Sequence, residues 1–435
     1  MPRKTFGRLR PVVLPAALFA AIGAPAAAQC PASQTRYSIV DLETLGGAVS
    51  SALDLDDAGR AVGGSLTAAG HLHPFLWKDG VMSDLGTLGG PSGSAAGGIN
   101  AVGEITGQSD NAAGQRRAFL YANGVMVELP TLDGRDGRGF DINDLGQVVG
   151  ISTAANGHQH AFLYDSDTGA LSDLGVGAPG DNSSTANAIN LVGQIAAWSG
   201  PSANPAGGAR AYLYESGAWT PLGTLGGSRS VAYGLDDSGR VVGWSDTAGD
   251  TSDHAFLWEN GVMRDLGTLG GPSSVAAGAH ASGPVVGGAD APDGSQRAFV
   301  LAGGEMADLN TLIPAGTGWE LDLATAVNAS GQIAGRGAIG GEFHAYIATP
   351  ATATVDDLSG LVESFELPKG TGNSLLVKLD RAREALGSCN PAGACAPLGA
   401  FLNEVEAQSG KKLTTAQADA LLSMTLALRV TLGCP

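Results

Sequence analysis

Asp84-Leu85-Gly86-Thr87-Leu88-Gly89-Gly90 is the stretch that decides the fold, because the chain repeats it. Exact or degraded copies, spaced 43 to 48 residues apart, begin at Asp41, Glu128, Asp173, Pro221, Asp265 and Asp308. A fixed period of this length is the sequence signature of a propeller, a solenoid or a repeat array. The repeat therefore predicts the architecture of most of the chain.

One unit of the repeat, from Ser51 to Gly90, predicts four short antiparallel strands. Asp79-Gly80 stands between two apolar runs and is a strong hairpin signal. Every unit also has a turn residue three positions before a Gly, and Asp or Asn at this spacing is typical of a type I turn. These turn residues are Asp56, Asn100, Asn143, Asn190, Asp236, His280 and Asn328.

Two columns of the repeat stay apolar and predict the core. One column holds leucine and the other holds an aromatic ring, and a lone four-stranded sheet cannot bury both. Neighbouring units must therefore cover them. The leucines are Leu42, Leu85, Leu129, Leu174, Leu222, Leu266 and Leu309, and the rings are Phe75, Phe119, Phe162, Tyr212, Phe256, Phe299 and Tyr346.

The ends of the repeat favour a closed ring over an open stack. The last unit has three strand-like runs, between 324 and 349, and then stops. Its missing fourth strand is present at the other end of the chain, as Tyr37–Leu42. A propeller that borrows this strand removes a sheet edge, whereas an open solenoid would need polar caps. We predict a mainly β protein with a seven-bladed β-propeller of ~44-residue, four-stranded blades over residues 29–350.

The repeated phrases resemble the HAF repeat of exported bacterial proteins, over about Tyr37 to Thr349. The triplet that gives the family its name stands here as His160-Ala161-Phe162 and His254-Ala255-Phe256. The family is described as an extracellular repeat without an established activity. The resemblance therefore implies location and architecture, and it implies no catalytic residue.

After Pro350 the apolar spacing changes to that of helices, which predicts a small C-terminal α-helical domain over residues 351–435. The runs Leu367-Pro368-Lys369-Gly370 and Ser409-Gly410-Lys411-Lys412-Leu413 resemble the FIMAH-type helical module of secreted bacterial proteins. That resemblance implies a disulfide between Cys395 and Cys434. Whether Cys30 pairs with Cys389 stays open.

Residues 1–28 have the basic start, short apolar run and small-residue end of a secretory signal peptide. We expect a secreted, extracellular or periplasmic protein without a membrane span, because no other apolar run approaches the roughly 20 residues that a span needs. The formal net charge is −18. A charge of this sign disfavours nucleic acid as a partner, since phosphate binding depends on Lys and Arg.

Departures from the repeat are the candidates for ligand binding. Trp198 and Trp244 occupy the same position in adjacent units, and Tyr233 belongs to the strand beside Trp244. Aromatic faces stack on sugars, so our hypothesis is that these three residues bind a ligand. The competing interpretation is that they pack between units. A basic residue two positions before each aromatic column residue, such as His73, predicts a contact with the acid before the leucine column, such as Asp84.

The sequence offers no catalytic, cofactor-binding or metal-binding residue by motif, and the acidic turns lack the ligand spacing of a calcium loop. We therefore expect a monomeric, non-enzymatic binding or scaffold protein, without cofactor, that presents its loops to an extracellular glycan or protein partner. The alternative is an extracellular carbohydrate-active enzyme, a hydrolase or lyase, with its site at the propeller axis. Only the enzyme should place a non-repeating acid–base cluster with perturbed pKa values in the axial funnel.

Overall fold

The computed structural model describes residues 35–434, apart from single positions at 92, 202, 282, 315, 366 and 389 and the pair 352–353. The expected signal peptide, Cys30 and Cys389 lie outside the described residues. Strands make up most of the chain as far as Pro350, and helices follow from Val355.

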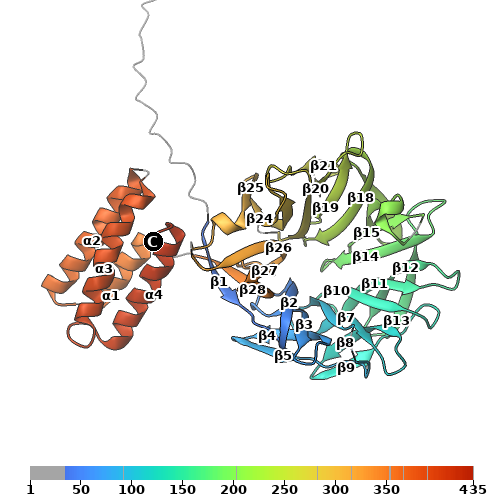
Figure 1. Ribbon diagram of the computed structural model, residues 1–435, viewed down its shortest axis with the longest axis horizontal. Coiled ribbons are helices and arrows are strands. Elements are labelled where there is room, and N and C mark those ends of the chain that lie inside the picture. Colours follow the sequence, from blue (N-terminus) through green and yellow to red (C-terminus); the bar gives the residue numbers. More distant parts are fainter. Residues whose placement is uncertain are drawn as a thin grey trace, which may run out of the picture. The chain divides into compact units, whose positions relative to one another are not determined.

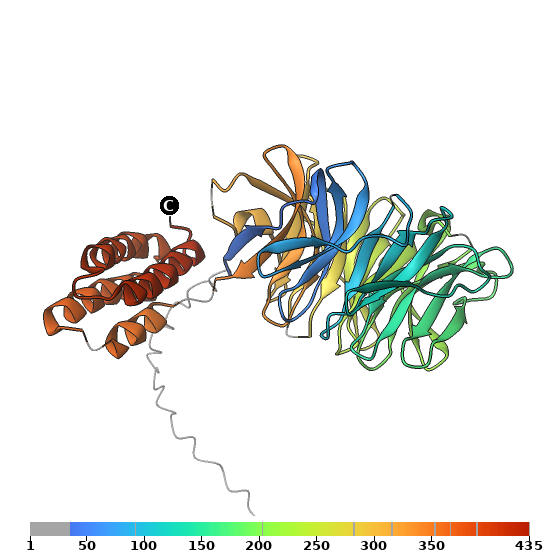
Figure 2. The ribbon, with the colours of Figure 1, turned by 90° about the horizontal axis from the view of Figure 1, so that it is seen from below.

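Within the described residues, five separate antiparallel sheets of four consecutive strands follow one another: β6–β9, β10–β13, β14–β17, β18–β21 and β22–β25. A sixth, eight-stranded sheet combines β2–β5 with β26–β28 and β1, and a single parallel pair, Val49 with Phe343, joins its two halves. Each set of four strands is called a unit below. Figures 1 and 2 show the units following one another, from β2–β5 in blue to β26–β28 in orange, until the last returns to the first.

The strands recur in the same order in every unit. The first strands are β2 (Gly46–Leu55), β6 (Ala95–Ile99), β10 (Gly137–Ile142), β14 (Ser183–Ile189), β18 (Gly226–Leu235), β22 (Ser274–Ala279) and β26 (Trp319–Val327). The second strands are β3 (Ala61–Thr67), β7 (Ile105–Asp110), β11 (Gln147–Thr153), β15 (Ile195–Gly200), β19 (Val241–Thr247), β23 (Val285–Asp290) and β27 (Ile333–Ile339).

The third and fourth strands form the outer hairpins. The third strands are β4 (Leu72–Lys78), β8 (Arg116–Ala122), β12 (Gln159–Asp165), β16 (Arg210–Glu215), β20 (Asp253–Glu259), β24 (Gln296–Ala302) and β28 (Glu342–Pro350). The fourth strands are β5 (Val81–Asp84), β9 (Val125–Glu128), β13 (Ala170–Gly175), β17 (Ala218–Gly223), β21 (Val262–Asp265), β25 (Glu305–Asp308) and, for the last unit, β1 (Tyr37–Asp41). Two short 3-10 helices are Pro205–Gly207 and Leu309–Thr311.

The outer hairpins turn as the sequence predicts. Asp79 and Gly80 both have positive φ angles, 51° and 82°, between β4 and β5. Two-residue turns of this kind match the right-handed twist of the strands, and they need residues that tolerate a left-handed backbone. Asn123-Gly124 and Asn260-Gly261 repeat the geometry in other units.

The repeated phrase links each unit to the next. The N–H of Leu88 donates to the hydroxyl of Ser109, 2.9 Å away in the second strand of the following unit, and the Leu225–Ser245 contact repeats this bond. The middle residue of the His-Ala-Phe triplet does the same, since the N–H of Ala255 donates to Ser274 at 2.8 Å. The residues that repeat are therefore the ones that hold neighbouring units together.

The N-terminal strand completes the last unit, as predicted. β1 pairs in antiparallel register with β28, from Tyr37 opposite Pro350 to Asp41 opposite Tyr346. Asp41 also accepts a hydrogen bond of 2.9 Å from His344, 303 residues away in sequence. Tyr37 is only 4% exposed and packs into the core that β24, β26 and β28 share.

Each pair of neighbouring units encloses its own apolar core, and the predicted leucine and aromatic columns supply much of it. The core between the last and first units contains Leu42, Phe75 and Ala345, so the succession of sheets closes on itself. Phe75 and Tyr346 have no exposed surface. The β-rich part is thus a propeller-like arrangement of sheets packed face to face.

The described residues after Pro350 form four helices: α1 (Val355–Ser364), α2 (Lys369–Gly387), α3 (Pro391–Gln408) and α4 (Thr415–Thr431). They share one apolar core, which includes Leu358, Leu379 and Phe401. Thr414 caps α4, as the sequence suggests, because its hydroxyl accepts from the N–H of Gln417. A disulfide joins Cys395 to Cys434. None of the described helices is long and apolar enough to cross a membrane.

Candidate functional site at the axis

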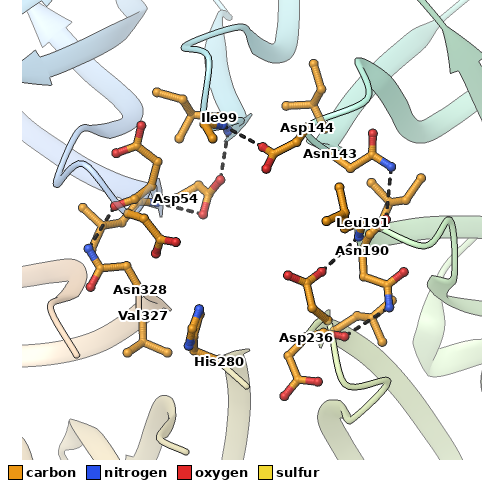
Figure 3. Close-up of a pocket in the computed structure, with 18 of the residues that line it drawn as sticks. Asp54, Ile99, Asn143, Asp144, Asn190, Leu191, Asp236, His280, Val327 and Asn328 are labelled. Carbon is orange, nitrogen blue, oxygen red and sulfur yellow. Dashed lines mark hydrogen bonds between the residues drawn. The ribbon is translucent and has the colours of Figure 1, made fainter. Parts of the chain in front are cut away.

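Two adjoining cavities lie between the first strands of all the units. The turn cavity, of about 220 Å³, is lined by the turn that follows each first strand. The strand cavity, of about 150 Å³, is lined by the middle of the same strands. Asp54, Leu235, Ala279 and Val327 border both. Figure 3 shows the lining side chains of the turn cavity around an open centre.

The turn residues form a ladder of hydrogen bonds around the turn cavity. The amide of Asn100 donates to the carbonyl of Asn143, that of Asn143 to Asn190, and that of Asn190 to Asp236, at 3.1 to 3.2 Å. Where the turn residue is an aspartate, its side chain has no N–H group that could donate this hydrogen bond. In the first unit Arg60 takes its place, because its guanidinium pairs with Asp56 and donates to the carbonyl of Ala101 at 2.8 Å.

Two aspartates interrupt the repeat at the axis. The position two residues before the turn residue is small in most units, but it is an aspartate in two of them. This column reads Asp54, Gly98, Asp141, Ala188, Gly234, Gly278 and Ala326. Both carboxylates line the strand cavity.

The two carboxylates lie on either side of the same stretch of β6. Asp54 Oδ2 accepts from the N–H of Ile99 at 2.9 Å. A Cβ atom on Gly98 would lie 2.8 Å from Asp141 Oδ1, so this glycine leaves the room that Asp141 occupies. Asp141 also accepts from the N–H of Ile189 at 2.8 Å. The acid pair is thus held by backbone donors from neighbouring units.

Burial is the main cause that raises the pKa values of both groups. It raises the pKa of Asp141 to about 7, and the nearby charge of Asp54 adds to this, against the lowering effect of the N–H groups of Ile189 and Ile142. Burial also raises the pKa of Asp54, with Asp56 contributing in the same direction. Two interacting carboxyl groups of this kind lose their protons in separate steps, so one can be an acid while the other is a base.

Neither Asp54 nor Asp141 is predicted from the sequence, where motifs offer no catalytic residue. The signal lies in the column two positions before the turn residue, which is aspartate in two units and glycine or alanine in the others. Among the residues that the structure describes, no group of three or more His, Cys, Asp or Glu side chains is arranged to hold a metal ion.

The predicted aromatic residues do not gather at one surface. Trp198 is 5% exposed and packs with Val231 and Trp244 between neighbouring units. The guanidinium of Arg229 lies 5.6 Å from the ring centre of Trp244 and pairs with Asp246. Tyr233 is 39% exposed and borders the strand cavity, which neither tryptophan lines.

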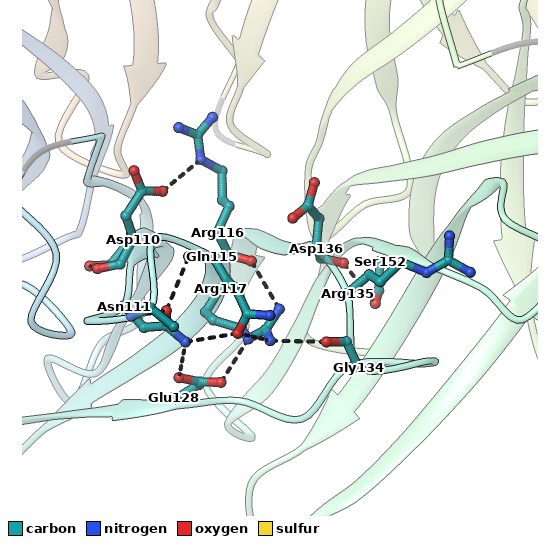
Figure 4. A network of polar contacts seen from close by, with 12 residues as sticks. Asp110, Asn111, Gln115, Arg116, Arg117, Glu128, Gly134, Arg135, Asp136 and Ser152 are labelled. Atoms are coloured by element: carbon teal, nitrogen blue, oxygen red, sulfur yellow. Dashed lines mark hydrogen bonds and ion pairs between the residues drawn. The ribbon is translucent and has the colours of Figure 1, made fainter.

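The predicted basic–acidic contact of the outer strands is present in five units. His73, His160, His254 and His344 contact the expected aspartates through Nδ1, and Arg117 contacts Glu128 at 2.7 Å. Figure 4 shows that Arg117 also donates to Gln115 and to the carbonyl of Gly134. In the β14–β17 unit the acid position is taken by Pro221, which lies opposite Tyr212, so Arg210 has no acid there; Arg297 pairs with Asp293 instead.

No family model matches the chain, and no curated protein matches it. Among solved structures it is similar to TolB from Acinetobacter baumannii, with 13% identity, a TM-score of 0.39, and coverage of 67% of this chain and 64% of that one. A puromycin-hydrolyzing peptidase of Mycobacterium tuberculosis has 12% identity and a TM-score of 0.48 over 74% of this chain and 55% of that one. An oligogalacturonate lyase in complex with manganese has 13% identity and a TM-score of 0.48 over 73% and 94%.

The chain thus spans less than two thirds of the length of the first two of these proteins. Because the identities are low and the TM-scores lie below 0.5, no residue, substrate or partner is carried over from them. Two of the three are nevertheless enzymes by name. The prediction that this protein is not an enzyme, which rested on the lack of a catalytic motif, is corrected at the axis: the pair Asp54 and Asp141 is the non-repeating acid–base cluster expected only of an enzyme.

Proposed function

We propose that the protein is an exported carbohydrate-active enzyme that acts by acid–base chemistry at the axis of a seven-bladed propeller. The observation that carries the proposal is the pair Asp54 and Asp141, which breaks the repeat, borders the strand cavity and has raised pKa values. A non-repeating acid–base cluster in the axial funnel is the feature that separates an enzyme from a scaffold.

The two carboxyl groups suit the two halves of a glycoside hydrolysis. Asp141, with a pKa of about 7, is protonated in about half of the molecules at pH 7 and in more of them below it, and this acid form donates its proton to the leaving oxygen as the bond between the sugar carbon and that oxygen breaks. Asp54 accepts a proton from the water that forms the new carbon–oxygen bond. Exchange with solvent then returns both groups to their starting states.

The size and charge of the cavities limit which substrate and which reaction class fit the site. Cavities of about 220 and 150 Å³ are smaller than the sites that enclose drug-sized ligands, so they suit a single terminal sugar. The carboxylates of Asp57, Asp144 and Asp237 border the turn cavity. They would repel the uronates on which a lyase acts, so a hydrolase is favoured over a lyase.

The wider assignment has separate support. The pairing of β1 with β28 and the core between the last and first units support a ring of seven blades closed by the N-terminal strand. The recurrent phrases support membership of the HAF-repeat family, and the helical core of residues 351–435 supports a FIMAH-like domain. The sequence of residues 1–28 and the Cys395–Cys434 disulfide support export to an oxidising compartment.

The direct test is hydrolysis of a panel of neutral and amino-sugar polysaccharides and nitrophenyl glycosides, measured as released reducing ends or nitrophenol. Asp54→Asn and Asp141→Asn should each lower turnover by about 100-fold or more, the usual contribution of a general acid or base. Asp265→Asn is the matched control, because this carboxylate contacts His254 on the outer strands, away from the axis.

The pH profile adds a second criterion. Turnover should fall as the pH rises through about 7, because the acid form of Asp141 is lost there. Turnover that Asp54→Asn and Asp141→Asn leave unchanged would reject the assignment of the acid pair. A folded protein that hydrolyses no member of the panel would reject the carbohydrate-active enzyme itself.

A further inference from the structure

Each first strand contains a β-bulge at the same place. The pairing with the second strand passes over one residue there, as it passes over Leu53 between Ala52 and Asp54. The first strands of the other units show the same shift of register. A bulge takes one residue out of the ladder and re-aims its side chain, and bulges are common next to active sites. The bulged residues therefore form a separate column around the axis.

This column carries large apolar side chains in alternate units only. All of its residues line the strand cavity. Leu53 and Tyr233 are 41% and 39% exposed, and Phe140 is half-buried. Large apolar side chains that stay accessible around a hollow are typical of a ligand site, because side chains that serve packing are buried. The column reads Leu53, Gly97, Phe140, Asn187, Tyr233, Ala277 and Thr325.

The polar members of the column hold the backbone beside two of the large ones. The amide of Asn187 donates to the carbonyl just before Tyr233 at 2.6 Å. The hydroxyl of Thr325 donates to the carbonyl just before Leu53 at 3.1 Å. Both contacts come from the preceding unit of the ring, so the bulges are fixed from outside their own strand. A ligand that contacts them does not have to order this backbone.

Two of the large side chains adjoin the acid pair in the chain. Leu53 precedes Asp54, and Phe140 precedes Asp141. All four side chains line the strand cavity, whose volume of about 150 Å³ suits one sugar ring. A ring that rests against Leu53 and Phe140 therefore lies in the cavity that both carboxyl groups border.

We propose that the bulge platform, formed by Leu53, Phe140 and Tyr233, binds the apolar C–H face of a glucose-type pyranose ring in the strand cavity. This inference rests on the proposed function, and it names the substrate class of that site. Equatorial hydroxyl groups leave only C–H groups on the faces of such a ring, and the negative face of an aromatic side chain attracts their hydrogens. The phenol of Tyr233 also donates to or accepts from a sugar hydroxyl.

The test is the binding of methyl 1-thio-β-glucoside, whose sulfur resists hydrolysis, to the full chain by titration calorimetry. Tyr233→Ala should lower the affinity about tenfold, the effect of one aromatic contact, and Tyr233→Phe should stay within about threefold because the ring remains. The melting temperature of both variants should stay within a few degrees, since the side chain is partly exposed.

Two controls accompany these variants. Phe343→Ala removes an aromatic side chain of similar exposure, 42%, which is not among the described residues that line either cavity. It should leave the affinity unchanged. Sorbitol has the hydroxyl groups of a sugar but no ring face, and it should not bind.

The outcomes separate the platform from the acid pair. Equal affinity of Tyr233→Ala and the original protein, or a folded original protein that does not bind the thioglucoside, would overturn the proposal. Binding that Tyr233→Ala weakens, with turnover that Asp54→Asn and Asp141→Asn leave unchanged, would keep the platform and reject the acid pair. Turnover that depends on the acid pair, with equal affinity in Tyr233→Ala, would reject the platform alone.

Discussion

Acidic side chains occur both on the outer strands and at the axis of this protein, but they recur in most units on the outer strands and depart from the repeat at the axis. On the outer strands, a histidine or arginine contacts an acid in unit after unit, as His73 contacts Asp84. At the axis, aspartate occupies a column in only two units, and glycine or alanine fills it elsewhere. A residue type that recurs in every unit is explained by the packing of units, whereas one that departs from the repeat needs an explanation of its own.

The difference also separates paired charges from unpaired ones. Asp265 on the outer strands has His254 as a partner and is partly exposed. Among the residues that the structure describes, Asp54 and Asp141 have only backbone N–H donors, and they line the strand cavity between the first strands. Carboxylates without a counter-charge cost stability when they are buried, so their presence at the axis calls for a function.

The largest expected effect comes from removing the strand that both regions need. Deletion of residues 37–41 takes away the pairing partner of β28 and the buried ring of Tyr37. We expect a fall in melting temperature of about 10 °C or more, measured by calorimetry, because an edge and a core are both opened. Asp41→Asn is the control, since it keeps the strand and alters one contact with His344. An unchanged melting profile of the deletion variant would contradict closure of the ring.

Gly98→Ala is the most local way to disturb the axis. The added methyl group would lie 2.8 Å from Asp141 Oδ1 and 2.9 Å from Asp141 Cα, which is inside normal contact. Overpacking of this kind costs about 1–3 kcal/mol of unfolding free energy, and turnover should fall because the acid pair moves. Gly360→Ala in α1 is the control: no atom lies within 4 Å of its Cβ position, and we expect a slight gain in stability. Full activity of Gly98→Ala would argue against a role of this pair.

Asp141 should make stability depend on pH in a definite direction. Its pKa is raised to about 7 in the folded protein, whereas an unfolded aspartate titrates near its ordinary value. Folding therefore takes up a proton between these values, and the stability linked to this proton is lost as the pH rises toward and through about 7. Urea unfolding of Asp141→Asn should lack this decline, by about 1 kcal/mol or more. Parallel pH curves of the two proteins would show that the pKa is not raised.

The smallest effect is expected on the outer strands. A double-mutant cycle of His254→Ala and Asp265→Ala should give a coupling of about 0.5 kcal/mol, because the pair is partly exposed. The equivalent pair of Arg117 and Glu128 should give more, since the arginine side chain is only 7% exposed. Neither cycle should change turnover. Loss of activity in the His254 cycle would remove the distinction between the two regions.

The strands and core of the repeated units could be predicted well from the sequence, because each feature recurs in many copies of the repeat. The leucine and aromatic columns, the Asp79-Gly80 turn and the strand shared between Tyr37 and Tyr346 all follow from local rules that the repeat confirms many times. The helices after Pro350 could be predicted equally well, because the spacing of apolar residues changes there to that of helices.

The axial site was harder to predict, because its residues are defined by their neighbours around the ring. Asp54 and Asp141 are 87 positions apart, and the packing of three successive units places them on either side of Gly98. Trp198 appeared as a candidate for stacking, but an aromatic residue that departs from the repeat can equally fill a gap between units, as its burial shows. Both aspartates stand out from the sequence only when each column of the repeat is compared across all units.

The pairing of β1 with β28 also determines when the protein can complete its fold during synthesis. Asp41 and His344 are 303 residues apart. At about 5–20 residues per second, a ribosome needs roughly 15–60 s between these two positions. During that time the first strand made must wait for the last, with its hydrogen-bonding edge unpaired. A chain truncated before β28 lacks the pairing partner of β1, so its N-terminal strand stays unpaired.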